Sequence, residues 1–330
     1  MRPATGLLAL VGLAALVLCA APLVGIEPVP LAALLDPRGS SPEAVILWQI
    51  RVPRVIAAFF AGAGLAVGGA TFQAVFRNPL ATPFTLGLSS GAAFGVALVT
   101  RLGVPLALAG IPLGPVAAFV GAMLAVATVW TITHLRPQFS SSALLLAGVA
   151  MSFVFSSLIL FLQYTASLGH SYRIVRWLMG GLAPVDIEAL LHMLPFVLVG
   201  IVALGWHARE LDLLATGADL AASRGVDVVR TRRVLFLATS VMVGGIVAAC
   251  GPIGFVGMMA PHICRLFVGA EHRWLLPCSC LFGGVFLAAS DTLARIVIAP
   301  AELPVGVLTA FFGGPFFLWL LLRRGGLTGE

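Results

Sequence analysis

The sequence contains no lysine, so all nineteen of its Lys/Arg positions are arginine. A Walker A loop needs a lysine that reaches the β- and γ-phosphates of ATP, and a Schiff-base enzyme needs a lysine amine. By itself the chain therefore fits neither class of protein. We expect a chain that carries out no covalent chemistry, so any ATP that drives it must be hydrolysed by another chain.

Charge is also scarce: only 10% of the 330 residues are charged, whereas 60% are apolar. Soluble chains average roughly 25% charged residues. This composition predicts an all-α polytopic membrane protein, because a helix satisfies its own backbone hydrogen bonds in lipid. The arginines lie between apolar runs, where positive residues orient helices in a bilayer. The net charge of +6 is therefore not taken as a sign of nucleic-acid binding.

The five cysteines show no paired spacing of the kind that holds zinc. They lie in or beside apolar segments, as buried thiols commonly do. We expect no metal site and no cofactor bound by this chain.

A helix needs about 20 apolar residues to cross the hydrocarbon core of a bilayer. Runs of that kind predict ten spans in a single permease domain of residues 1–330. The first run follows Arg2 and could instead be a cleaved signal, although it is long for one. The predicted spans are 5–25, 55–76, 84–102, 113–133, 143–163, 190–207, 234–251, 253–268, 274–298 and 304–322.

Arginine is unevenly distributed between the two sides of this arrangement. With both termini inside, twelve arginines fall on the inner side and seven on the outer side. Cytoplasmic loops carry the excess of positive residues. Both termini are therefore predicted to be cytoplasmic.

Two connecting segments are predicted to be helical without crossing the membrane. Residues 171–181 place two arginines on one helical face and apolar residues on another, as in an interfacial helix. The longest inner connection, 208–233, contains a short helix over 215–225 with Asp219 early, Arg224 late and Gly225 at the C′ position. The alternative for 215–225 is a solvated turn.

Small residues recur at a spacing of four in the second and third predicted spans. This spacing places them on one helical face, where backbones can approach closely in lipid. It predicts tight helix packing and says nothing about a substrate. The residues are Gly64, Gly68, Gly87, Gly91 and Gly95.

Asp291 is the most costly residue to place in the membrane. A carboxylate deep in a span costs about 2.5–3.5 kcal/mol on insertion scales and requires a partner. Arg295 follows one turn later, at a spacing that allows an ion pair along the helix. We favour this structural pairing. The alternative is an ion-coupled secondary transporter that uses Asp291.

Several motifs, in colinear order along nearly the whole chain, resemble one known family. The amino-terminal half contains Arg51-Val-Pro-Arg54, Arg77-Asn-Pro-Leu-Ala-Thr-Pro83 and Leu86-Gly-Leu-Ser-Ser-Gly-Ala92. The carboxyl-terminal half contains the segment 251–265, Asp291-Thr-Leu-Ala-Arg295 and Glu302-Leu-Pro-Val-Gly306. Together they are similar to the FecCD-type permeases, which are membrane subunits of ABC importers for vitamin B12, haem and ferric siderophores.

The resemblance implies a type II ABC importer permease fold with ten helices and a homodimer in the bacterial inner membrane. It also implies two ATPase subunits that hold ATP and Mg on the inside, and a substrate-binding protein on the outside. Arg51, Arg54 and Arg295 correspond to arginines that receive acidic residues of the binding protein.

The same resemblance assigns residues 217–226 to docking on the ATPase. This sequence differs from the usual pattern there, because Ala222 and Arg224 stand where the family commonly has arginine and leucine. The residues assigned to this coupling segment are Gly217, Asp219, Ala221, Arg224, Gly225 and Val226.

Overall fold

A computed structural model describes residues 3–37, 41–103, 107–108, 111–134, 141–183 and 185–325. Most of these residues are helical. Two short strands, β1 (Ala107–Leu108) and β2 (Ile111–Pro112), form one antiparallel pair. The helical architecture follows from the composition, because long apolar runs leave no polar alternation that a half-buried strand would need.

Each of the ten predicted spans is a helix in the structure. Their ends lie near the predicted ones, and the largest difference is at α11, which begins at Val228 rather than Val234 because Asp227 caps it with a hydrogen bond from the Arg230 N–H. The ten helices are α1 (Pro3–Ala20), α3 (Val52–Phe76), α4 (Leu88–Arg101), α5 (Leu113–His134), α6 (Ser141–Tyr164), α8 (Ile187–Trp206), α11 (Val228–Cys250), α12 (Val256–Val268), α13 (His272–Ile296) and α14 (Val305–Gly325).

Seven helical segments in the described part of the chain are long and apolar enough to cross a membrane. The other three predicted spans are shorter: α4 has 14 residues, α12 has 13, and the apolar part of α14 is Val305–Leu320. The irregular segment before α12 is packed inside the protein, where Ile253 is 1% exposed. Non-helical backbone at membrane depth is tolerated in such protein-covered positions.

Shorter helical elements connect the spans. They are η1 (Ala21–Leu23), η2 (Leu31–Leu35), α2 (Pro42–Val45), the π-helical turn η3 (Ile46–Arg51), η4 (Pro83–Leu86), α7 (Leu168–Leu178), α9 (Ala208–Thr216) and α10 (Ala218–Ser223). The predicted interfacial helix is α7, which begins three residues earlier than expected because Ser167 caps it. The predicted short helix over 215–225 is divided at Gly217 between α9 and α10.

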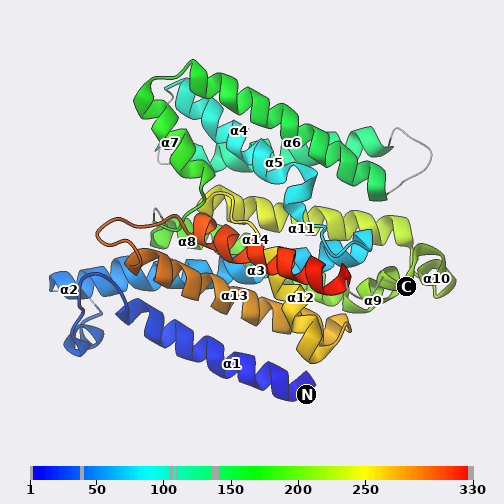
Figure 1. The fold of residues 1–330 in the computed structure, drawn as a ribbon, viewed down its shortest axis with the longest axis horizontal. Helices are drawn as coiled ribbons and strands as arrows, with labels where there is room; N and C mark the ends of the chain where they lie inside the picture. The colour runs from blue at the N-terminus through cyan, green and yellow to red at the C-terminus, as the bar shows by residue number, and fades with distance from the viewer. Residues whose placement is uncertain are drawn as a thin grey trace.

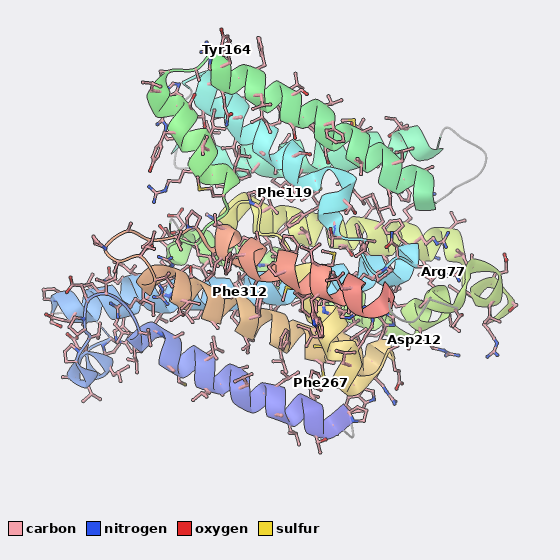
Figure 2. The ribbon with its side chains drawn as sticks, in the orientation of Figure 1. Arg77, Phe119, Tyr164, Asp212, Phe267 and Phe312 are labelled. Atoms are coloured by element: carbon pink, nitrogen blue, oxygen red, sulfur yellow. The ribbon has the colours of Figure 1, made fainter. Side chains whose placement is uncertain are left out.

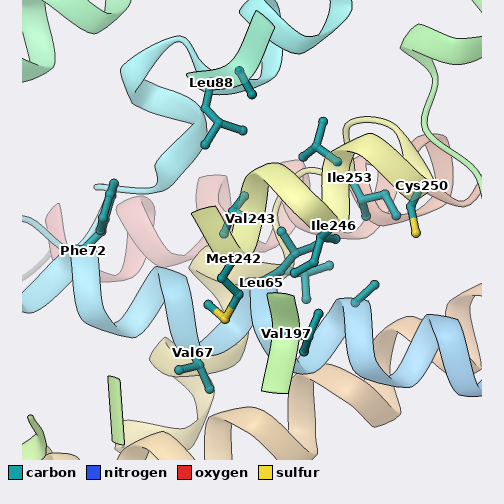
Figure 3. Packing of buried hydrophobic residues seen from close by; sticks show 14 of the residues in the cluster. Leu65, Val67, Phe72, Leu88, Val197, Met242, Val243, Ile246, Cys250 and Ile253 are labelled. Atoms are coloured by element: carbon teal, nitrogen blue, oxygen red, sulfur yellow. The ribbon is translucent and has the colours of Figure 1, made fainter. Parts of the chain in front are cut away.

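Helix α3 lies at the centre of the larger helix group, in contact with α8, α11, α12 and α13. Helices α4 to α7 form a second group, which meets the first at α11 (Figure 1). Leu65 of α3 packs with Met242 and Ile246 of α11 and with Val197 of α8 in the core where these helices meet (Figure 3). The burial of almost every α3 side chain makes this helix the scaffold for the functional groups at its two ends.

Glycines bring the core helices into backbone contact. A side chain on Gly62 would collide with the Gly283 carbonyl of α13, and one on Gly69 would collide with the Gly257 carbonyl of α12. These two contacts fix the relation of α3 to both neighbours, as small residues do in membrane helix pairs. The structure places the predicted packing glycines in three places: Gly64 and Gly68 against α11, Gly91 and Gly95 against α5, and Gly87 at the start of α4 with φ +79°.

The helical elements mark two opposite ends along the long axis of the molecule. The start of α1, the end of α14 and helices α9 and α10 lie at one end, whereas α2 and α7 lie at the other (Figure 1). Helices α3 and α13 run antiparallel between these ends, because Gly62 meets Gly283 in the middle while Arg54 meets Asp291 near the α2 end. We call these the α9–α10 end and the α7 end.

Candidate functional site

The start of α3 carries two arginines on one face at the α7 end. Pro53 has no N–H to donate to the fourth residue before it, and the chain adopts the wider π-helical turn η3 immediately before this proline. Arg51 ends that turn and Arg54 follows three residues later, so the two side chains project from neighbouring positions. Both are almost fully buried, at 6% exposure each.

Arg54 forms a bidentate ion pair with Asp291 of α13. Its Nε donates to Oδ2 at 2.9 Å and its Nη2 donates to Oδ1 at 3.0 Å. The remaining Nη1 donates to Oε2 of Glu302 at 2.8 Å. Asp291 is 1% exposed. Such forked guanidinium–carboxylate pairs fix both groups in orientation as well as in position.

Arg295 is the second cation beside Asp291. Its Nε lies 3.5 Å from Asp291 Oδ2, which is the pair that the spacing along α13 predicted. Its Nη2 donates to Thr292 Oγ1 at 3.0 Å and to the Ala21 carbonyl at 3.3 Å. Its buried Nη1 has no hydrogen-bond partner among the residues that the structure describes. Arg295 therefore has hydrogen-bonding capacity that these contacts leave unused.

Arg51 has no carboxylate within ion-pair distance in the described part of the chain. Its Nη2 donates to the Glu27 carbonyl at 2.6 Å and its Nη1 to the Pro22 carbonyl at 3.4 Å. The guanidinium lies directly against Gly25, where a larger residue would meet it. Backbone carbonyls orient this arginine while leaving its charge without a direct counter-ion.

Two cavities flank the ion pair between Arg54 and Glu302. The smaller, of about 200 Å³, brings together the three predicted arginines Arg51, Arg54 and Arg295 with both Glu27 and Glu302. The larger, of about 440 Å³, also includes Arg54 and Glu302 but extends toward α7. We call them the arginine cavity and the α7 cavity. The Arg54–Glu302 pair borders both.

The predicted coupling segment lies at the opposite end. Gly217 separates α9 from α10 with φ +141°, and Gly225 follows α10 with φ +84°. The Val226 N–H donates to the Ala221 carbonyl at 3.1 Å, and the Gly225 N–H to the Ala222 carbonyl at 3.0 Å. These two bonds form a Schellman cap, the ending expected from a C′ glycine.

Exposure divides the coupling segment into an anchored side and a free side. Ala221 is fully buried, which fixes α10 on the protein. Asp219 and Arg224 are exposed. The short helix therefore presents charges of both signs at the α9–α10 end.

Side-chain contacts that the sequence did not predict join α9, which precedes this segment, to α13, and join α12 to α3. Asp212 of α9 lies at the α9–α10 end (Figure 2). Its Oδ1 accepts the His272 backbone N–H at 2.9 Å and lies 2.6 Å from His272 Nδ1. Nearby, Arg265 of α12 donates to Gln73 of α3. An amphipathic pattern cannot reveal such pairs, because their members are distant in sequence.

The chain matches the model of the FecCD transport family over residues 9–323. It is 39% identical to the hemin transport system permease protein HmuU of Yersinia pestis, over 84% of each protein. It is 40% identical to the vitamin B12 import system permease protein BtuC of Klebsiella pneumoniae, over 87% of this chain and 85% of that protein.

A solved structure described as an inward-facing metal-chelate type ABC transporter has the same fold. It superposes with a TM-score of 0.85 at 31% identity, covering 96% of this chain and 98% of the other. The sequence match and the shared fold extend over both ends of the molecule, including the arginine cavity and the coupling segment. The chain therefore belongs to the FecCD transport family.

Proposed function

We propose that this chain is the membrane permease of a binding-protein-dependent ABC importer for an iron chelate or a corrinoid. The observation that carries the proposal is the near-complete match to the hemin permease HmuU and the vitamin B12 permease BtuC. In this proposal two copies form the transport path, two ATPase subunits supply energy, and an external binding protein delivers the substrate.

The α9–α10 end is proposed to face the cytoplasm and the α7 end the outside of a bacterial inner membrane. Arginines at the α9–α10 end, such as Arg77, Arg209, Arg224 and Arg230, are exposed. At the α7 end Arg173 and Arg176 are exposed, whereas Arg51, Arg54 and Arg295 are buried. The positive-inside rule favours the end with the larger number of accessible arginines, the α9–α10 end, as the cytoplasmic one.

The arginine cavity supports the docking of acidic side chains from the binding protein. Within the described part of the chain, the Arg51 guanidinium donates hydrogen bonds only to backbone carbonyls, and Arg295 has an Nη1 without a hydrogen-bond partner. Arg54 is instead occupied by Asp291 and Glu302. We therefore assign Arg51 and Arg295 the contact with an incoming carboxylate, and Arg54 the task of holding the cluster together.

The coupling segment supports a different contact at the other end. Helix α10 is anchored by Ala221 and ended by the Gly225 cap, so its exposed charges keep a fixed direction. ATP-driven closure of the partner subunits would push on this segment and shift the dimer between outward-open and inward-open states.

The ion-coupled alternative requires a carboxylate that can release its partners and bind an ion. Asp291 is 1% exposed and is paired with both Arg54 and Arg295. Charged residues inside membrane segments commonly form such ion pairs with one another. These contacts favour the structural assignment of Asp291.

Reconstitution of the chain with its ATPase and binding protein in liposomes tests the proposed function. We expect chelate uptake to require both ATP and the binding protein. Its rate should not change when a proton or sodium gradient is imposed. An Arg51→Glu variant should lower the association rate of the binding protein in a salt-dependent manner, because charges at a contact steer encounter. Uptake driven by an ion gradient without the ATPase would overturn the proposal.

A further inference from the structure

The α7 cavity contains positive charge that the docking contact does not use. Three arginines line it, Arg54, Arg173 and Arg176, against one carboxylate, that of Glu302. Glu302 is paired with Arg54 at 2.8 Å, so its charge is already engaged. Arg173 and Arg176 are exposed, and neither guanidinium forms a hydrogen bond or ion pair with any residue in the described ranges.

Helix α7 presents these two arginines as a pair. They are three residues apart, which places them on one face of the helix. Ile174 points the other way and is 1% exposed, packed in a cluster with Ala93, Ala97 and Ile159. Burial of that opposite face prevents α7 from rotating, so the arginines stay directed at the cavity.

The end of α7 is also fixed to two other elements of the cavity wall. The Gly181 N–H donates to the Cys250 carbonyl at 2.8 Å, and the Gly306 N–H donates to the Gly180 carbonyl at 3.2 Å. A side chain on Gly180, where φ is +65°, would collide with the Pro252 carbonyl. These contacts therefore hold together the three elements that form the cavity wall: α7, the end of α11 and the start of α14.

Apolar groups make up much of the remaining wall. They are Trp177, Leu182, Ala183, Ala249, Leu303 and Pro304. The volume of about 440 Å³ lies within the range of small-molecule sites, roughly 300–1,000 Å³. Cations beside an apolar wall suit a ligand with carboxylates on a largely apolar body, because guanidinium groups bind carboxylates through paired hydrogen bonds.

We propose that the α7 cavity is an entry site for an anionic chelate, whose carboxylates bind Arg173 and Arg176 while its apolar body lies against Trp177. This inference deepens the proposed function and rests on it for the direction of transport. A concave surface with an excess of one sign of charge, as here with three arginines and one carboxylate, raises the local concentration of the opposite ion. The site therefore favours carboxylate-bearing chelates over uncharged chelates and uncharged corrinoids.

Binding of hemin and of its dimethyl ester to the full chain in zwitterionic nanodiscs tests this site, with empty nanodiscs subtracted. The ester retains the iron macrocycle and lacks both carboxylates. We expect the Kd of hemin for the wild-type chain to be at least about tenfold lower than that of the ester, because only hemin can form the two charge-assisted hydrogen bonds. High salt should remove this preference.

Two charge reversals provide the matched comparison. R173E/R176E should remove the preference for hemin over the ester. R101E should preserve it, because Arg101 lies at the same end but bonds Thr165 and does not line the cavity. Equal retention of hemin and ester by the wild-type chain, or an unchanged preference in R173E/R176E, would overturn the site.

Two further readouts separate this inference from the proposed function. If R173E/R176E loses association with the binding protein while its hemin retention is unchanged, the arginines belong to a protein contact and the cargo site is wrong. If the assembled complex imports chelates with ATP but the hemin preference is absent, the function stands and the site falls. If hemin preference is present but no chelate is imported with ATP, the site stands and the proposed function falls.

Discussion

The two ends of the α3–α13 pair use charge in opposite ways. At the α7 end Arg54, Asp291 and Arg295 are each at most 6% exposed and are paired within the chain. At the α9–α10 end Asp219 and Arg224 are exposed on a short capped helix. Burial pairs Arg54 with Asp291 inside the protein, whereas exposure leaves Asp219 and Arg224 available to another chain.

Solvation explains the difference. A charge taken out of water loses several kcal/mol of solvation, which only close partners can offset. Breaking the buried cluster should therefore lower the free energy of unfolding. An exposed charge costs little to change, so its main effect is on association. Substitutions at the two ends should separate folding from coupling.

The largest expected effect is that of Asp291→Ala. It leaves Arg54 and Arg295 buried without their shared carboxylate, and we expect a loss of about 3–5 kcal/mol in the free energy of unfolding. Denaturant titration of the purified protein in detergent measures this loss. Asp291→Asn should cost less, since the amide still accepts hydrogen bonds.

Glu302→Gln is the matched control for that change. Its carboxylate binds the same Arg54, but its side chain is 39% exposed. Water can replace the lost contact, so the cost should be only a fraction of that of Asp291→Ala. Equal losses for the two carboxylates would show that burial does not determine the importance of the cluster.

Gly225→Val should have the next largest effect, at the other end. A β-branched residue at φ +84° stores about 1–3 kcal/mol of backbone strain, and relief of that strain would open the Schellman cap. We expect normal membrane insertion but weaker co-purification of the ATPase and lower ATP-driven uptake. Gly225→Asn should retain most of both, because Asn tolerates a left-handed backbone. Full coupling in Gly225→Val would contradict the assignment of the cap.

Asp212→Asn tests the link between α9 and α13. The substitution weakens the contact at the start of α13, where Asp212 Oδ1 lies within hydrogen-bonding distance of both the His272 backbone N–H and Nδ1. We expect the free energy of unfolding to fall by about 1 kcal/mol, as on loss of a helix cap. The amount of substrate imported per ATP hydrolysed should fall. Glu271→Gln is the control, because Glu271 is an exposed neighbour that pairs only with exposed Arg273 among the described contacts.

The smallest effect on stability is expected from Asp219→Asn combined with Arg224→Gln. Both side chains are exposed, so the free energy of unfolding should change by less than about 0.5 kcal/mol. Affinity for the ATPase should nevertheless fall and lose part of its salt dependence. A clear drop in stability with unchanged ATPase affinity would place these charges in the fold rather than in the contact.

The sequence predicted all ten span helices because each is an apolar run, seven of them long enough to cross a membrane, and such a run has few other conformations open to it in lipid. It also predicted the Gly225 ending, since a helix that stops at glycine adopts a positive φ there. The Asp291–Arg295 pair followed from i to i+4 spacing. These features depend on neighbours within one or two turns.

Only the tertiary structure decided which distant groups meet. Arg54 and Asp291 are 237 residues apart in sequence, and Asp212 and His272 are 60 apart. The Arg54–Asp291 pair depends on α3 and α13 being antiparallel and in contact through Gly62 and Gly283, and the Asp212–His272 pair depends on α9 lying against the start of α13. The sequence determined the helices, their caps and the kinds of charge at their ends. Helix packing determined which charges are neutralised and which remain free, because that outcome depends on burial and on partners from other helices.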